Sequence, residues 1–220
     1  MAKSKCPRCG LVNAVTDTNC RRCGTALQDA PTQQAAAEQA RQRGILKRLL
    51  WIVTATAIAV FIFYLSLLLT SDDLGFPQRE VVERAVNILE QKGFEREAFV
   101  LGRLTRYRGS DNWWNTYVGH RDAYAATNFP FELLTLYPDF FQVPVDDNER
   151  AAILLHEAYH LLGSSEEVAL EGVWRNKHRL GWTAEKYGNS RVWRSTRELT
   201  MAYVPELFRC GDDQKSDCTP

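Results

Sequence analysis

The sequence lacks charge over one long stretch: no Asp, Glu, Lys or Arg occurs from Leu49 to Thr70. As a helix rising ~1.5 Å per residue, this stretch would be ~33 Å long, which is enough to cross the hydrocarbon core of a bilayer. So long an absence of charge argues against a buried helix of a soluble protein, and a cleaved signal peptide would not follow 48 largely polar residues. The stretch predicts a single transmembrane helix over residues 49–70.

The chain also lacks a net charge, because a basic N-terminal part and an acidic C-terminal part compensate each other. Residues 1–48 carry nine Lys/Arg against three Asp/Glu, a net of +6, and residues 71–220 carry 18 against 24, a net of −6. The basic residues that precede the uncharged stretch are Arg41, Arg43, Lys47 and Arg48, whereas Asp72 and Asp73 follow it. Basic flanks stay on the cytoplasmic side of a membrane. We therefore expect a single-pass protein of the cell membrane, with a cytoplasmic N-terminus and an extracytoplasmic C-terminal domain.

Cysteine is absent from residues 24–209. The N-terminal end carries two C-x-x-C-G runs, Cys6-Pro-Arg-Cys9-Gly10 and Cys20-Arg-Arg-Cys23-Gly24, whose spacing is typical of tetrahedral zinc sites. Residues 1–27 resemble a short zinc ribbon, which is too small to build a hydrophobic core and would take its folding free energy from the metal. The alternative is that the two cysteine pairs are redox-active dithiols. The glycine after each pair favours a metal site instead, because it allows the tight turn of a metal-binding knuckle.

The remaining cysteines, Cys210 and Cys218, lie near the C-terminus. In an oxidising compartment we expect the short loop between them to close as a disulfide. Two free thiols remain the alternative, because connectivity cannot be read from a sequence.

Histidine is scarce, with four in the chain, yet two of them lie in His156-Glu157-Ala158-Tyr159-His160. Glu157 is the only charged residue between Ala151 and Leu162, which predicts a helix buried on most sides. Residues four apart share one face of a helix, so both imidazoles reach one zinc ion while Glu157 sits beside it. The run resembles the H-E-x-x-H motif of zincin metallopeptidases. The resemblance implies that His156 and His160 bind a catalytic zinc and that Glu157 is the general base.

A catalytic zinc needs a third protein ligand. Glu166 completes the metzincin spacing H-E-x-x-H-x-x-G-x-x-ligand, although metzincins usually carry His or Asp there. Glu167, with Glu171 four residues later, resembles the gluzincin arrangement instead. The pattern favours Glu166, because it continues a stripe that is otherwise apolar as far as Val173. Glu167 stays the alternative ligand, and Glu171 is predicted to accept a hydrogen bond from a ligand imidazole.

The expected fold class is α+β: a mainly helical zincin-like metallopeptidase domain with a small sheet, preceded by a zinc ribbon and one transmembrane helix. The expected order is zinc ribbon 1–27, polar linker 28–48, transmembrane helix 49–70 and metallopeptidase domain 71–220. Helices are predicted from Pro77 to Gly93, through the motif, from Glu166 to about Arg179 and from Ser190 to Tyr203. Asp146 and Glu149 predict the cap that starts the motif helix, and Gly163 predicts its end. One or two short strands, broken by Pro130 and Pro138, are predicted within residues 129–143.

Together these features predict a membrane-anchored zinc metallopeptidase that hydrolyses a peptide or protein substrate, with one catalytic and one structural Zn²⁺. Candidates to stabilise the oxyanion are Tyr203, Tyr187 and His178. A non-catalytic zinc-binding membrane adaptor or sensor is the alternative, and hydrolysis of a non-peptide bond stays open. Glu157 favours catalysis, because a purely structural site has no use for an acid beside its ligands. A protein is the possible partner of the ribbon. Nucleic acid is not expected there, since the three arginines of the ribbon are more typical of a solvated surface.

Overall fold

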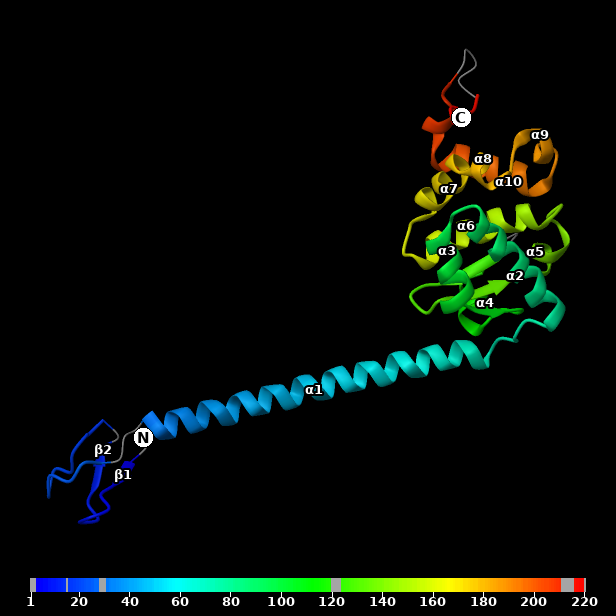
Figure 1. Cartoon of the computed structure of the whole chain (residues 1–220). Coiled ribbons are helices and arrows are strands. Elements are labelled where there is room, and N and C mark those ends of the chain that lie inside the picture. The colour runs from blue at the N-terminus through cyan, green and yellow to red at the C-terminus, as the bar shows by residue number, and fades with distance from the viewer. Residues whose placement is uncertain (1–2, 15, 28–30, 120–123, 211–215, 220) are drawn as a thin grey trace. The chain divides into compact units, whose positions relative to one another are not determined.

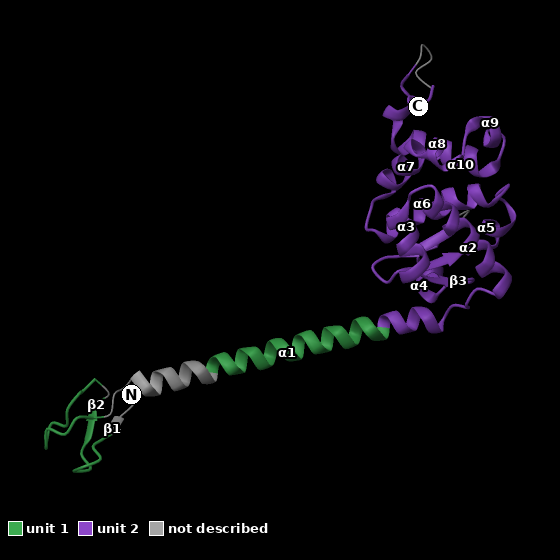
Figure 2. Ribbon diagram, viewed as in Figure 1, with its two compact units in different colours: residues 1–62 green, residues 63–220 purple. Residues whose placement is uncertain are grey.

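The computed structural model describes residues 3–14, 16–27, 31–119, 124–210 and 216–219, with the backbone alone described for residues 3–4 and 31–40 (Figure 1). The chain forms two compact units, residues 1–62 and residues 63–220 (Figure 2). The boundary falls inside the long helix α1, so the second unit begins within the predicted transmembrane stretch rather than after it.

The first unit opens with a small hairpin. β1 (Lys3–Lys5) pairs antiparallel with β2 (Val12–Ala14). Beside the hairpin, Cys6, Cys20 and Leu27 form a small buried cluster. No larger core is present among the described residues of this unit, as expected for a segment that depends on a metal.

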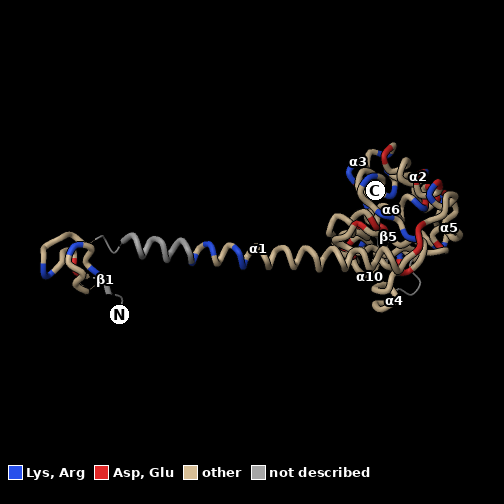
Figure 3. The backbone as a smooth tube through the Cα atoms, turned by 90° about the horizontal axis from the view of Figure 1, so that it is seen from below, with Lys and Arg blue, Asp and Glu red and all other residues tan. Residues whose placement is uncertain are grey.

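α1 (Pro31–Leu69) runs through both the predicted linker and the predicted membrane stretch. The linker is therefore helical from Pro31 onward, while residues 28–30 lie outside the described part of the chain. The part from Arg41 to Leu69 is long and apolar enough to cross a membrane. Figure 3 shows Lys and Arg on α1 ahead of its uncharged stretch.

The second unit contains a three-stranded mixed sheet with the order β3-β5-β4. β3 (Arg106–Arg108) is parallel to β5 (Leu133–Leu136), and β4 (Ala125–Asn128) is antiparallel to it. Within residues 129–143 the structure has one strand, β5, which agrees with the one or two short strands that the sequence predicts. Pro138 opens the short helix α5 (Pro138–Gln142) instead of breaking a strand, because its fixed φ suits the first helical position.

Helices make up most of the second unit, which agrees with the expected α+β class. Their bounds are α2 (Phe76–Gln91), α3 (Glu95–Phe99), the π-helix η1 (Val100–Leu104), α4 (Trp113–Val118), α6 (Asp147–Leu161), α7 (Glu166–Arg175), α8 (Lys177–Leu180), α9 (Ala184–Tyr187), α10 (Arg191–Tyr203) and the 3₁₀ helix η2 (Pro205–Phe208). The helix predicted from Glu166 to Arg179 is interrupted at Asn176, whose side-chain amide donates to the carbonyl oxygen of Gly172 at 2.8 Å.

α6 carries the H-E-x-x-H run through the middle of the hydrophobic core. It packs against α2, α7 and β4, and its residues 151–155 are all buried. Its predicted start and end are confirmed: the Asp146 side chain accepts from the Glu149 amide at 3.1 Å, and Gly163 has φ +84°. The helix that holds the histidines is thus fixed at both ends.

The buried carboxylate of Glu149 anchors the start of α6 to the C-terminal helices. One oxygen accepts from the main-chain amide of Val145 at 2.8 Å. The other accepts from Trp182 Nε1 at 3.2 Å and from the Ser190 hydroxyl. Trp182 packs in turn against Trp193, with ring centroids 4.6 Å apart. These contacts tie α6 to the region between α8 and α10.

Candidate metal centre

Three potential ligand atoms converge where α6 meets α7. His156 and His160 lie one turn apart on α6, with their Nε2 atoms 3.0 Å apart. Ser165 caps α7, so that Glu166 is the first residue of this helix. The carboxylate of Glu166 reaches the rings of both His156 and His160. Glu166 Oε2 lies 3.0 Å from His160 Nε2, and Oε1 lies 3.5 Å from His156 Nε2.

These distances suit a zinc ion. Zinc–nitrogen and zinc–oxygen bonds of ~2.0–2.1 Å at a tetrahedral angle place two ligand atoms ~3.3 Å apart. The measured separations of 3.0, 3.0 and 3.5 Å fall around that value. Two imidazoles and one carboxylate also form a recurrent ligand set of catalytic zinc sites, which leave a fourth position open.

The hydrogen bonding of His160 gives a second reason for a cation. Its Nδ1 lies 3.1 Å from the carbonyl oxygen of Ser164, which can only accept, so the proton of the neutral ring is on Nδ1. Nε2 then presents a lone pair to the Glu166 carboxylate. Without a metal only a proton can relieve that repulsion, and the Glu166 hydrogen bond accordingly raises the pKa of His160. The same contacts, with His156 first and His160 next, lower the pKa of Glu166.

The other acids of α7 do not join this group. Glu167 is exposed and contributes no atom to the cluster of potential ligands in the described chain. Glu171 differs from its predicted role, because its carboxylate pairs with Arg175 Nε at 2.6 Å, and the Ser164 carbonyl takes the hydrogen bond of His160 instead. The Ser164 carbonyl oxygen lies just after the end of α6, next to the His160 ring. The Glu171 side chain lies more than one turn into α7 and is therefore further from this ring. The assignment of Glu166 as third ligand stays a prediction, which the geometry favours over Glu167.

Glu157 lies on the wall of a cavity beside the three ligand atoms. The cavity has a volume of about 520 Å³ and is lined by His156, Glu157, His160, Glu166, residues 124–127 around β4, and Ser195, Thr196 and Leu199 of α10. Glu157 is 7% exposed, and its Oε2 accepts from the hydroxyl of Thr127 at 2.7 Å. A larger cavity of about 790 Å³, between α2 and β3, contains none of the predicted site residues.

β4 lines this cavity and is an edge strand of the sheet in the part of the chain that the structure describes. Its partner in the sheet is β5, with Ala126 opposite Thr135, and Tyr137 donates to the carbonyl of Tyr124 at 3.0 Å. Because hydrogen-bonded pairs alternate along an antiparallel ladder, the main-chain groups of Ala125 and Thr127 point away from β5. An extended peptide can pair with such an edge.

The residues proposed to stabilise an oxyanion do not line the cavity. Tyr187 is buried and donates to Asp146 at 2.8 Å, and neither Tyr203 nor His178 is a lining residue. Tyr124 and Ser195 line it instead. No local pattern in the sequence indicates these side chains or Thr127, since their role depends on where β4 and α10 pack against α6.

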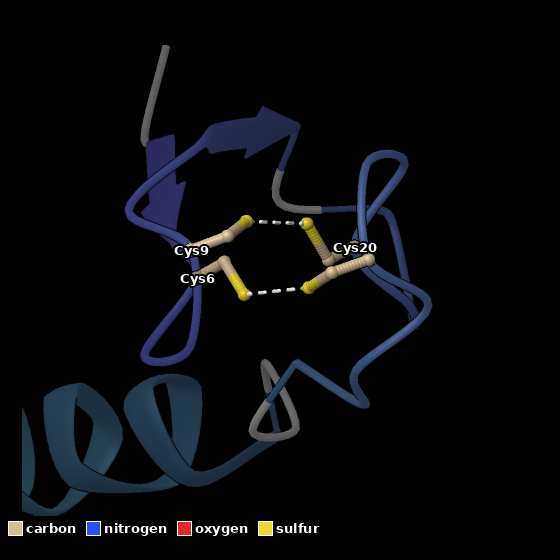
Figure 4. Close-up of side chains that lie close together, drawn as sticks. Cys6, Cys9 and Cys20 are labelled. Carbon is tan, nitrogen blue, oxygen red and sulfur yellow. Dashed lines mark hydrogen bonds between the residues drawn. The ribbon is translucent and has the colours of Figure 1, made fainter.

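The four N-terminal cysteines form a second possible metal site (Figure 4). The sulfur atoms of Cys6 and Cys23 are 3.6 Å apart and those of Cys9 and Cys20 are 3.5 Å apart. Zinc–sulfur bonds of ~2.3 Å place tetrahedral ligands ~3.8 Å apart. Both knuckles turn through a glycine of positive φ, +72° at Gly10 and +69° at Gly24, as their spacing predicts.

The thiol pKa values of this cluster also favour a cation. Burial opposes ionisation of Cys20, but the main-chain amides of Arg22 and Cys23 lower its pKa to about 6. The pKa of Cys9 instead rises to about 12, against the effect of a main-chain hydrogen bond with Leu11, because burial and the neighbouring sulfurs disfavour a further negative charge. A metal ion would hold these sulfurs as thiolates.

A peptide of residues 1–27 is expected to bind one zinc ion and to unfold when the zinc is chelated, because the metal supplies the folding free energy. Mass spectrometry under native conditions would give the stoichiometry, and circular dichroism would follow the fold. The double substitution Cys9→Ser and Cys20→Ser is the matched control, which should bind no zinc. A peptide that is equally folded after chelation would contradict the assignment.

No protein-family model, no curated protein and no solved structure matches this chain. The similarity to zincins is therefore confined to the H-E-x-x-H run and the spacing around it. What the chain does has to be inferred from the site itself.

Proposed function

We propose that the protein is a membrane-anchored zinc metallopeptidase. The observation that carries the proposal is the position of Glu157: its carboxylate lines an open cavity beside the potential ligand atoms of His156, His160 and Glu166. A structural zinc site, which only stabilises the fold, needs neither an open cavity nor a carboxylate that lies beside the metal without binding it.

The chemistry divides between the ion and the side chains around it. A zinc ion bound here would supply Lewis acidity, which makes a water acidic near neutral pH and polarises a carbonyl. Thr127 holds Glu157 Oε2, so Oε1 is the oxygen that takes the proton from the attacking water. Glu157 then gives that proton to the nitrogen of the leaving amine as the carbon–nitrogen bond breaks.

A peptide is the substrate class that the cavity fits best. The outward main-chain groups of Ala125 and Thr127 offer hydrogen bonds to an extended backbone, whichever side chains it carries. Thr127 lies on the same strand and contacts Glu157, so a peptide paired with this edge would present a carbonyl near the metal centre.

We also propose that the N-terminus is cytoplasmic and that residues 71–220 lie outside the cytoplasm, in a protein of the cell membrane. Two observations support this orientation. Basic residues precede the uncharged part of α1 and acidic residues follow it. Cys210 and Cys218 form a disulfide, whereas Cys6, Cys9, Cys20 and Cys23 are free, which fits an oxidising compartment for one end of the chain and a reducing one for the other.

The proposal is tested with the full chain in lipid nanodiscs and a library of unstructured peptides. We expect cleavage that stops on chelation and returns when zinc is added back. Because chelation also removes metal from the ribbon, a chain with Cys9→Ser and Cys20→Ser serves as control and should cleave as well as the wild type. Absence of cleavage under every zinc-replete condition would favour the non-catalytic adaptor.

Thr127→Val is expected to lower kcat by roughly 10- to 100-fold without loss of zinc, because a hydrogen bond to a charged group contributes roughly 1.5–3 kcal/mol. Valine keeps the shape of the side chain but leaves Glu157 without its positioning donor. Thr127→Ser, which keeps the hydroxyl, should restore most of the activity. A loss in both variants, or a change in KM alone, would indicate that Thr127 acts on substrate binding instead.

A further inference from the structure

The last two turns of α1 are packed into the second unit. The Phe63 ring lies 5.4 Å from the Phe131 ring and 5.7 Å from the Trp113 ring. Trp113 Nε1 donates to the Ser66 hydroxyl at 2.9 Å, and Leu67 is 1% exposed. Residues 63–69 therefore belong to the folded domain although they lie in the predicted membrane stretch.

Arg108 fastens the end of this helix. Its guanidinium, almost buried, donates to the carbonyl oxygen of Leu68 at 2.6 Å and also to the carbonyl oxygen of Ser71. A cation is favourable at a helix C-terminus, where the last carbonyls lack partners within the helix. The same guanidinium pairs with Asp73. Arg108 of β3 thus holds residues 68–73 against the sheet of the second unit.

Beside this contact the domain exposes large apolar side chains. α4 carries no charge, and its exposed residues are Trp113 at 42%, Trp114 at 40%, Tyr117 at 80% and Val118 at 52%. Phe129, at 59%, follows Asn128, which accepts a hydrogen bond from Asn112 at the start of α4. We call the four exposed residues of α4, Trp113, Trp114, Tyr117 and Val118, the aromatic patch.

We propose that the aromatic patch lies in the headgroup region of the bilayer that α1 crosses. Trp113 contacts Phe63 and Ser66, which are inside the uncharged stretch, so α4 is held at the depth of the last turns of the span. Tryptophan and tyrosine are the residues that membrane proteins place at this depth, because one end of each ring system is apolar and the other is polar. Because the aromatic patch is next to the end of the predicted membrane stretch of α1, we assign lipid as the partner that covers it.

One consequence concerns the metal centre. Phe129 lines the cavity with His156 and Glu157, and the residue before it, Asn128, accepts the hydrogen bond of Asn112 at the start of α4. The proposal therefore brings one wall of that cavity to the membrane surface.

The test uses the full chain in nanodiscs that hold one chain each. Trp51 is replaced by phenylalanine, because it lies within α1 and would meet lipid in any case. The tryptophans of the core, Trp174, Trp182 and Trp193, are at most 4% exposed and give a constant background. Fluorescence is then recorded with lipids brominated near the headgroup and, separately, with acrylamide in the water.

The expected result is quenching by the brominated lipid that is lost when Trp113 and Trp114 are both replaced by phenylalanine. In that tryptophan-depleted chain, Tyr117→Trp should restore quenching by lipid. Phe99→Trp on α3, a site that is 58% exposed, is the matched control and should be quenched by acrylamide alone.

Two outcomes would overturn the proposal. Quenching of Trp113, Trp114 and the reporter at position 117 by acrylamide but not by lipid would mean that the patch faces water. Protection from both quenchers would mean that protein covers it, and protection that appears only with two chains per disc would identify a second copy as the cover.

Discussion

The Glu157→Gln variant is expected to keep its zinc and to lose peptide hydrolysis by at least ~10²-fold, the lower end for general acid–base catalysis. Glutamine keeps the length of the side chain and can still accept the hydrogen bond of Thr127, but it cannot take a proton. Metal analysis of the purified chain should give the same zinc content as the wild type. Turnover is measured on a peptide that the wild type cleaves.

His156→Ala is the contrasting variant, because it removes a ligand rather than the base. It should lose both the zinc of this centre and the activity, whereas Glu157→Gln should lose only the activity. Full activity of Glu157→Gln would refute the mechanism. Loss of zinc in Glu157→Gln would mean that this carboxylate is itself a ligand, and the assignment of the other three would need revision.

Glu166→Ala is expected to remove most of the zinc affinity of the second unit. The variant loses one of three protein ligands, so the loss should exceed the ~10- to 100-fold that is typical of changes outside the ligand set. Total zinc should fall from two ions per chain to one, since the ribbon keeps its own. The affinity of the remaining site can be followed by competition with a chelator of known strength.

Glu167→Ala is the matched control, one residue away on the same helix and exposed. It should retain both zinc ions, because its carboxylate lies outside the cluster of donor atoms. If Glu167→Ala loses zinc and Glu166→Ala keeps it, the gluzincin-like arrangement becomes the better description. After chelation both variants should unfold like the wild type, whereas in excess zinc only Glu166→Ala should lack the stabilisation by bound metal, which separates metal binding from folding.

Much of this protein could be predicted from short stretches of its sequence. The uncharged stretch before Thr70 predicted the long helix, and the two C-x-x-C-G runs predicted four sulfur atoms around one point. Asp146 and Gly163 predicted the ends of α6 to within a residue or two. In each case the physical cause is local: hydrogen bonds and side-chain faces within a few residues of one another.

Other features were decided only by the packing of distant segments. The strand that donates to Glu157 lies 30 residues earlier in the chain, and nothing near Thr127 indicates that partner. Glu166 and Glu167 are both plausible ligands by spacing, and the packing of α7 against α6 brings the carboxylate of Glu166 to His160. The disulfide between Cys210 and Cys218 was one of two options until the fold brought their Cα atoms to 5.3 Å.

The contact between α1 and the domain is the clearest example of this division. Hydropathy alone predicts the membrane stretch at residues 49–70, because the transfer of uncharged side chains into lipid depends on composition and length. It does not show that residues 63–69 also pack against Trp113 and Phe131, or that Arg108 holds the carbonyl of Leu68 from a position 40 residues away. Local sequence fixes which residues prefer helix, metal or lipid, whereas contacts between distant residues form only when the whole domain finds a common arrangement that buries their side chains and satisfies their hydrogen bonds.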